Sequence, residues 1–188
     1  MRAWRLAGAR GARIAENRTE SHNGRNPLER LLAFQFPVCA AACMAAQLQE
    51  SGWRLVNDKA CESGDKGIPP RERMEELLRD CLAQGEQRVV VDRPNMETRQ
   101  RERWLKITRA QGVPDTLVAV VYLDTPLEEC QRRVVNREHH RLAADEKSLK
   151  VIQHFVDAAN PPWLKEGFGA IFHIQTSEKA AGFIEGMA

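Results

Sequence analysis

The fold is decided by two stretches, RVVVDRPN (residues 88–95) and LVAVVYLD (residues 117–124), in each of which an apolar run meets an aspartate. Three consecutive valines are typical of a strand that is buried on both faces of a parallel sheet. The charged segment 98–111 predicts a helix between the two runs, and a Gly-Val-Pro sequence at 112–114 ends it. Strand, helix and strand in this order indicate a parallel βαβ unit.

The same alternation extends outward from this unit in both directions. Further strands are expected at residues 53–56 and 170–174, and further helices at residues 39–50, 71–84, 127–137, 144–159 and from Ser177 onward. Prolines in the first turn and glycines after the last turn support several of these boundaries. Strands that alternate with helices predict an α/β domain, with a doubly wound, mostly parallel sheet and helices on both faces.

The first strand of this sheet is the weak point of the prediction. Residues 31–38 are apolar, but Pro37 lacks the amide that a sheet ladder needs and would confine a strand to an edge or an end. We therefore expect no well-packed central strand here like those at Val89 and Val118. The sheet is expected to be missing or altered at its first strand.

The chain divides into an N-terminal segment and one domain. Residues 1–30 contain seven arginines and three glutamates, and few large apolar side chains, so we expect an arginine-rich disordered segment. A mitochondrial transit peptide and an uninformative tail both fit its composition. Residues 31–188 are enough for a single α/β domain. The net charge of +2 is too small to indicate nucleic-acid binding by itself.

The cysteines and the hydropathy indicate the cellular compartment in which the protein is expected. Five cysteines are scattered without metal-ligand spacing, as expected of reduced thiols in an intracellular protein, nuclear or cytoplasmic, or mitochondrial if the N-terminus is a transit peptide. No apolar run reaches the roughly 18 residues that a membrane span requires, so no membrane partner is expected. The sequence does not indicate a protein partner.

Acidic residues follow three of the expected strands. Asp58, Asp92 and Asp124 each come at or just after the end of an apolar run. In parallel α/β sheets, ligands bind beyond the carboxyl ends of the strands, where the strand order reverses. We therefore expect the functional site at this edge.

Three stretches carry a resemblance to a known family. The first is the Asp-x-x-Asn motif of Asp92 to Asn95, with the arginine-bearing segment and the Gly-Val-Pro turn that follow it. The second is the PPWLKEGFGAI sequence at residues 161–171. The third is the Val-Asn-Asp sequence at residues 56–58, which is one residue shorter than in the family. In this order they resemble the polynucleotide 5′-hydroxyl kinase domain over residues 44–175. The resemblance implies a P-loop NTPase fold and transfer of the γ-phosphate of ATP, with Mg²⁺, to a 5′-hydroxyl of DNA or RNA.

The resemblance also implies roles for residues. Asp58 would accept the hydroxyl proton, and the lid arginines Arg132, Arg133 and Arg137 would stabilise the transferring phosphoryl group, because a guanidinium can bind two phosphate oxygens. Substrate contacts are expected from Asp92, Asn95, Arg99, Arg101, His140 and Arg141. Asp92 could hold Mg²⁺ through water or orient its neighbours, but no cluster of metal ligands is expected. The alternatives are a solvated basic helix for the arginines, turn or cap formation for Asp92 and Asn95, and structural packing for residues 161–168.

The ATP side of such an enzyme is missing from the sequence. No Gly-Lys dipeptide is present, no lysine precedes Lys59, and residues 37–45 (PVCAAACMA) contain no Gly, Lys, Ser or Thr. These are the residue types that hold ATP phosphates and Mg²⁺ in a P-loop. Three hypotheses follow: a kinase that binds ATP by unusual means, a kinase-like relic or mis-assembled gene product, and a non-catalytic nucleic-acid-binding module.

Overall fold

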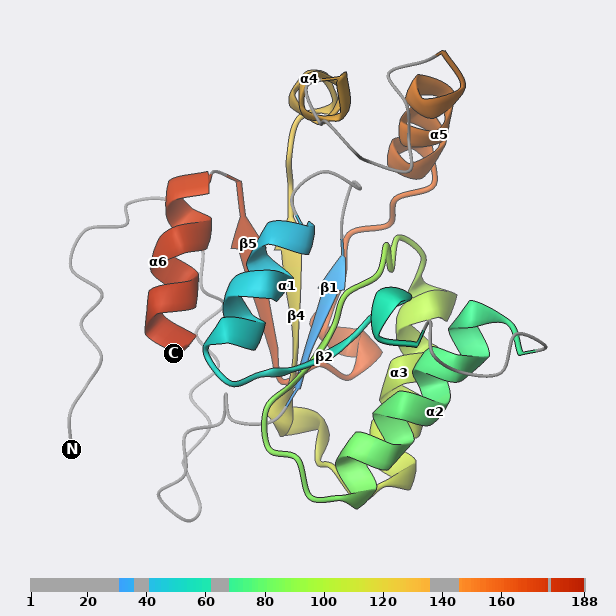
Figure 1. Cartoon of the computed structure of the whole chain (residues 1–188), viewed down its shortest axis with the longest axis vertical. Helices are drawn as coiled ribbons and strands as arrows, with labels where there is room; N and C mark the ends of the chain where they lie inside the picture. The colour runs from blue at the N-terminus through green and yellow to red at the C-terminus, as the bar shows by residue number, and fades with distance from the viewer. Residues whose placement is uncertain (1–30, 36–40, 62–67, 136–145, 176, 188) are drawn as a thin grey trace.

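The computed structural model of the 188-residue chain describes residues 31–35, 41–61, 68–135, 146–175 and 177–187. The arginine-rich segment 1–30 of the sequence analysis lies outside these residues. The described residues form a parallel sheet with helices on both faces (Figure 1). This is the α/β architecture that the alternating pattern predicts.

The sheet has five parallel strands in the order β2-β3-β1-β4-β5. They are β1 (Leu31–Gln35), β2 (Arg54–Val56), β3 (Val89–Val91), β4 (Val118–Leu123) and β5 (Ala170–Ile174). The chain moves outward from β1 to β2, returns to β3 beside β1, and then continues on the other side to β4 and β5. The strand order therefore reverses at β1, where a doubly wound sheet binds its ligands.

The position of β1 corrects one expectation. Leu31 pairs with Val89 of β3 on one side and with Val118 of β4 on the other, so this strand lies in the middle of the sheet. The prediction that residues 31–38 would form no central strand was wrong. The reason is that β1 ends at Gln35, before Pro37, so the missing proline amide falls outside the ladder.

Six α-helices are present in the part of the chain that the structure describes. They are α1 (Ala41–Glu50), α2 (Pro70–Ala83), α3 (Thr98–Ala110), α4 (Leu127–Val135), α5 (Glu146–Asp157) and α6 (Ser177–Met187). These bounds agree with the expected helices to within a few residues at each end. None of the described helices has the length and apolarity to cross a membrane.

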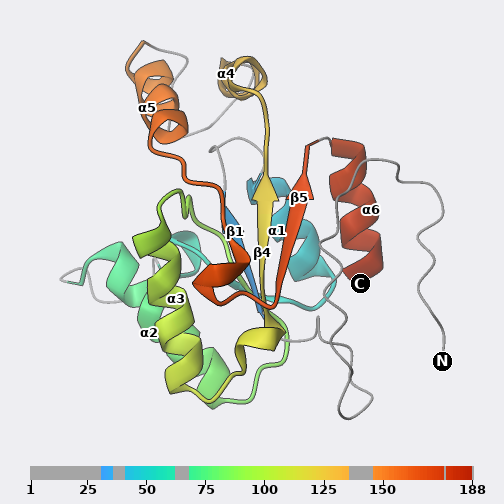
Figure 2. The same cartoon turned by 180° about the vertical axis from the view of Figure 1, so that it is seen from behind.

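Alternate residues of the strands face two apolar layers. Helices α1 and α6 pack against one face, which includes Val90 and Val121. Helices α2 and α3 pack against the opposite face, which includes Val89, Val91 and Val120. Neighbouring side chains of a strand point to opposite faces. The three valines of β3 are therefore all fully buried, and the two layers are visible from both sides of the molecule (Figures 1 and 2).

Helices α4 and α5 form a smaller unit beyond the carboxyl ends of the strands (Figure 1). They pack together through the buried Cys130 and Ile152, with Leu127 and Leu149 around them. The unit thus faces the edge at which a ligand is expected.

The segment before β5 packs closely on the turn before β4. A Cβ atom at Gly169 would lie 2.4 Å from the Thr116 carbonyl oxygen, a distance that real Cβ contacts do not reach. The Gly169 N–H also donates a hydrogen bond to the Val118 carbonyl at 2.8 Å. Glycine is thus required at this position because two backbone segments touch.

Substituting Gly169→Ala should lower the free energy of unfolding by about 1–3 kcal/mol, because the added methyl group must displace the Thr116 backbone. The matched control is Gly182→Ala in helix α6, where a Cβ would meet no atom within 4 Å. That control should instead stabilise the protein by up to about 1 kcal/mol through helix propensity. Urea denaturation measures both, and equal stability of the two variants would contradict the close packing.

Candidate functional site

Three aspartates follow the carboxyl ends of three strands, as the sequence predicts. Asp58 lies just beyond β2, whereas Asp92 and Asp124 directly follow β3 and β4. The Asp92 N–H donates a hydrogen bond to the Val56 carbonyl at 2.9 Å, so the pairing of β2 with β3 continues up to this aspartate. Because β1 separates β3 from β4, Asp58 and Asp92 lie on one side of β1 and Asp124 lies on the other.

The surroundings of Asp92 make its carboxyl a weaker acid than a solvent-exposed aspartate. Burial raises the pKa of the Asp92 carboxyl above its usual value of 3.8, while a hydrogen bond from Asn57 lowers the pKa and the charge of Asp58 raises it. A buried carboxylate beside a second acid opposes folding, and such groups occur often at functional sites. The position supports a role for Asp92 in the site, and its substrate contact stays a prediction.

The Asp92→Asn variant should gain more stability over the wild type at pH 7 than at pH 3. A raised folded-state pKa means that the folded protein binds the Asp92 proton more tightly than the unfolded chain does. The stability from this proton is complete below about pH 3.9 and is lost as the pH rises through the folded-state pKa. Asparagine stays neutral, so the variant does not lose this stability as the pH rises. Urea denaturation at pH 3, 5 and 7 measures the difference in the free energy of unfolding between the variant and the wild type.

The control for this pH dependence is Glu76→Gln, which changes an exposed carboxyl of α2 to an amide. Its stability should stay within about 0.5 kcal/mol of the wild type at each pH, as for most surface substitutions. A difference between the Asp92→Asn variant and the wild type that stays constant from pH 3 to pH 7 would contradict the raised pKa.

Asp58 is accessible and has a cationic neighbour. Its side chain is 49% exposed, and its Oδ1 lies 3.6 Å from Nη1 of Arg93 in the loop between β3 and α3. This separation is too long for a hydrogen bond, and the ion pair is weak at this exposure. The carboxylate is therefore accessible from solvent, and its role as a base stays a prediction.

Arg93 was not among the residues expected in the site. It lies inside the Asp92-to-Asn95 motif, between a strand end and a helix, and this position was the available signal. Its guanidinium also lies 3.5 Å from the Met74 sulfur of helix α2. Arg93 thus links the β3–α3 loop to both β2 and α2.

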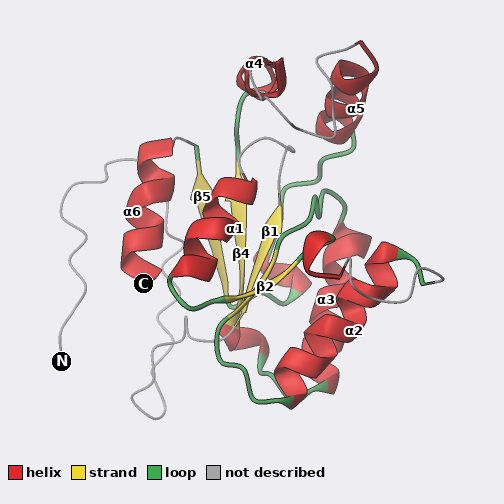
Figure 3. Ribbon diagram, in the orientation of Figure 1, coloured by secondary structure: helices red, strands yellow, loops and turns green. Residues whose placement is uncertain are grey.

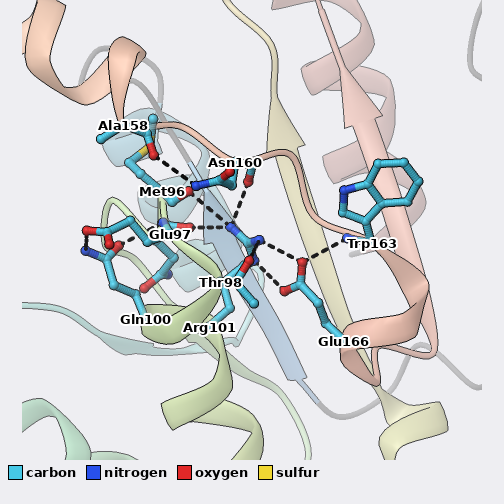
Figure 4. Close-up of polar contacts among 10 residues, drawn as sticks. Met96, Glu97, Thr98, Gln100, Arg101, Ala158, Asn160, Trp163 and Glu166 are labelled. Atoms are coloured by element: carbon cyan, nitrogen blue, oxygen red, sulfur yellow. Dashed lines mark hydrogen bonds and ion pairs between the residues drawn. The ribbon is translucent and has the colours of Figure 1, made fainter.

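A buried ion pair between Arg101 and Glu166 connects helix α3 to the loop before β5 (Figure 4). The two side chains are 0% and 5% exposed, and Nε and Nη2 of Arg101 each lie 2.7 Å from a Glu166 oxygen. Nη1 donates to the carbonyls of Asn95 at 3.0 Å and Asn160 at 2.9 Å. Glu166 also accepts a hydrogen bond from the Trp163 N–H at 3.1 Å. All three nitrogens of the guanidinium therefore donate hydrogen bonds to groups inside the protein.

These contacts correct two substrate-binding assignments. Arg101 has no exposed surface with which to meet a ligand. Asn95 is 1% exposed, and its Oδ1 accepts a hydrogen bond from the Trp104 indole at 2.7 Å. Both residues instead hold the loop that carries Asp92 and Arg93. The contacts of Glu166 support the packing role considered for residues 161–168 at this one position.

Substituting Arg101→Gln should destabilise the protein by about 3–5 kcal/mol, because it leaves the Glu166 charge buried without its partner. Thermal and urea denaturation measure this loss. Arg79→Gln is the control, since it breaks the exposed pair of Arg79 with Glu75 and should cost no more than about 1 kcal/mol.

Glu166→Gln provides a second, milder test of the same pair, because the amide can keep part of the hydrogen bonding. It should fall between Arg101→Gln and the wild type in stability. A cost below 1 kcal/mol for both buried variants would show that the pair is not a main support of this loop.

Two of the expected lid arginines lie on helix α4, beyond the sheet (Figure 3). Nε of Arg132 lies 2.7 Å from Oε2 of Glu129, and Arg133 binds the other oxygen of the same carboxylate. These hydrogen bonds lower the pKa of Glu129 to about 2. The catalytic role of both arginines stays a prediction, and Arg137, His140 and Arg141 lie outside the described residues.

Arg99 remains accessible to a ligand. Its side chain is 74% exposed, and its Nε lies 2.6 Å from Oε2 of Glu97. Together with Arg93 it borders a cavity between helices α2 and α3. Its substrate contact stays a prediction.

Comparison with known proteins identifies the family. Residues 42–162, more than half of the chain, match the family model described as AAA domain. The chain belongs to this family. The AAA-domain match includes Asp58, Asp92 and the whole of helix α3, so it covers the acceptor side described above. No curated protein matches the chain.

Solved structures extend the similarity beyond the AAA-domain match. A gluconokinase from Sinorhizobium meliloti 1021 is 16% identical and has a TM-score of 0.55, over 86% of this chain and 90% of the gluconokinase. Chaetomium thermophilum Kti12 in complex with ADP-AlF3 is 11% identical, with a TM-score of 0.54 over 84% and 96% of the two chains. The Deinococcus radiodurans tunicamycin resistance protein is 14% identical, with a TM-score of 0.53 over 85% and 95%. These similarities show the fold, and the predicted P-loop NTPase-like class is confirmed.

The ATP side of this AAA domain has the expected backbone plan but different residues. A P-loop is a strand, the sequence G-x-x-x-x-G-K-[ST] and a helix. Here β1 ends at Gln35 and α1 begins at Ala41. With the first glycine of the motif placed at Gln35, its Gly-Lys-Ser positions fall on residues 40–42, which are all alanine. Alanine supplies neither a charge nor a hydroxyl group, so these residues do not fit the usual binding of ATP phosphates.

A metal ion would also find few ligands in this AAA domain. Across the described ranges, no three His, Cys, Asp or Glu side chains gather where they could hold a metal. Mg²⁺ typically binds through one or two carboxylates, with water and substrate phosphates completing its octahedron. Asp92 is a suitable carboxylate, but the hydroxyl ligand of the usual P-loop is absent from residues 37–45.

Proposed function

We propose that this chain is a kinase-like protein that binds the 5′-hydroxyl end of a DNA or RNA strand and is impaired in ATP-dependent phosphate transfer. The observation that carries the proposal is the contrast between the two halves of one site. On the acceptor half, Asp58 and Asp92 lie at the ends of neighbouring strands. On the donor half, the sequence has alanine at residues 40–42, and α1 begins at Ala41.

The acceptor half has the chemistry for activating a hydroxyl. A hydroxyl group attacks phosphorus more readily when a nearby base takes its proton. Asp58 is half exposed and can serve as this base, while Arg93 lies 3.6 Å away and offers a positive charge beside it. Asp92 adds a second carboxylate that can orient water or a cation.

The resemblance to polynucleotide kinases supports a nucleic-acid acceptor. The stretches that carry it meet in the structure, because Arg101 from one stretch is bound to Glu166 from another. They therefore specify the loop that presents Asp92 and Arg93. The AAA-domain match itself is also compatible with a small-molecule acceptor, and the experiment below separates the two.

The test restores the donor half. The variant Gln35→Gly, Ala40→Gly, Ala41→Lys, Ala42→Ser carries G-x-x-x-x-G-K-S from the last residue of β1 to the second residue of α1. With ATP and Mg²⁺, it should phosphorylate a 5′-hydroxyl oligonucleotide at least about 100-fold faster than the wild type, since single stabilising donors contribute 10²–10³. Transfer of ³²P to oligonucleotides and, in parallel, to gluconate measures the rate and the acceptor class.

Controls and outcomes are defined within the restored variant. Adding Asp58→Asn should reduce transfer by about 10²–10⁴, as expected for loss of a general base, whereas adding Asp80→Asn on α2 should not. Oligonucleotide binding without transfer by either protein would favour a non-catalytic binding module. Transfer to gluconate alone, or equally fast transfer by the wild type, would refute the proposal.

A further inference from the structure

A cavity of about 220 Å³ lies between helix α2, the β3–α3 loop and helix α3. Its lining includes four arginines from these three elements: Arg71, Arg93, Arg99 and Arg103. No carboxylate side chain lines it. Pockets for drug-sized ligands measure roughly 300–1,000 Å³, so this one suits a smaller group. Its size and charge point to a compact anion.

The positive charge of the cavity is only partly compensated. Arg71 lies 3.9 Å from Glu75 and Arg93 lies 3.6 Å from Asp58, distances at which neither pair forms a good hydrogen bond. Arg103 forms no ion pair with any residue that the structure describes. A ligand could therefore approach Arg71, Arg93 and Arg103 without first breaking strong contacts, whereas Arg99 is already paired with Glu97 at 2.6 Å.

The wall of the cavity is held in place by buried contacts. Two further lining residues, Asn95 and Trp104, are joined by a 2.7 Å hydrogen bond and are 1% and 2% exposed. Arg101 binds the Asn95 carbonyl from behind, at 3.0 Å. This support keeps the β3–α3 loop fixed between α2 and α3. Binding of a ligand to Arg93 thus requires little further ordering of this loop, so the loss of conformational entropy on binding is small.

We propose that this cavity binds a phosphate group of the acceptor strand, next to the hydroxyl that Asp58 contacts. The proposal rests on the proposed function. One guanidinium group can donate two hydrogen bonds to two oxygens of a phosphate, and arginines from three elements can surround one phosphate. Arg93 borders the cavity and also lies 3.6 Å from Asp58, so a phosphate held there would place the neighbouring sugar hydroxyl near this carboxylate.

The test measures binding without ATP, by calorimetry. Adenosine 3′-monophosphate should bind at least about tenfold more tightly than adenosine, because charge-assisted hydrogen bonds to a phosphate are strong. Arg103→Gln and, separately, Arg71→Gln should each weaken nucleotide binding about tenfold. Lys106→Gln removes one charge from the exposed surface of the same helix α3 and should change binding less than twofold. Circular dichroism checks that each variant is folded.

A second measurement uses a 5′-hydroxyl oligonucleotide at several salt concentrations. For single strands, the logarithm of the affinity falls with the logarithm of salt by about 0.7 for each phosphate contact. Arg103→Gln should reduce this slope by about that amount, whereas Lys106→Gln should not. Equal effects of the two substitutions would overturn the proposal.

The remaining outcomes separate the possible ligands. If adenosine binds as tightly as adenosine 3′-monophosphate, the cavity does not bind the phosphate group and the proposal is overturned. Inorganic phosphate binding as tightly as the nucleotide would show that it holds a free oxyanion, which overturns the acceptor assignment. Transfer by the restored variant with no loss in its Arg103→Gln form would overturn the cavity proposal alone. Nucleotide binding in the cavity with no transfer by the restored variant would overturn only the catalytic part of the proposed function.

Discussion

The acceptor side of this protein depends on one buried ion pair, Arg101 with Glu166. A charge in the interior is stable only when its partners are close and well oriented, and here they come from two separate segments, the β3–α3 loop and the segment before β5. The pair sets the path of the β3–α3 loop, and this loop carries Asp92 and Arg93. The same pair explains why two stretches far apart in the sequence carry one family resemblance. They are two halves of a single support.

The two halves of the site differ in what they retain. The acceptor half keeps an accessible carboxylate, Asp58, beside Asp92, whose burial works against stability. The donor half keeps the geometry of a P-loop fold, with β1 central and α1 starting a few residues later. Its alanines lack the chemistry of the usual loop. Backbone architecture and phosphate-binding side chains are therefore separable in this AAA domain, because the strand is held by its pairing with β3 and β4.

Much of the fold could be predicted from the sequence because hydrophobic periodicity reports burial directly. The valines of β3 and the aspartates at the strand ends are local signals, and the structure places them as expected. The sequence was a poorer guide where a role depends on a distant partner. Arg101 resembles a substrate contact until Glu166, far along the chain, is placed beside it. Pro37 was a misleading signal for β1, since the strand ends before it.

The separation of Arg101 and Glu166 also affects the order of folding during synthesis. The two residues are 65 positions apart in the chain. At about 5–20 residues per second, a ribosome needs roughly 3–13 s to make that length. For this interval the βαβ unit around β3 exists without the acid that neutralises its buried guanidinium. The acceptor loop therefore reaches its final form only after residue 166 has been made, later than the strands β1 to β4 of the sheet.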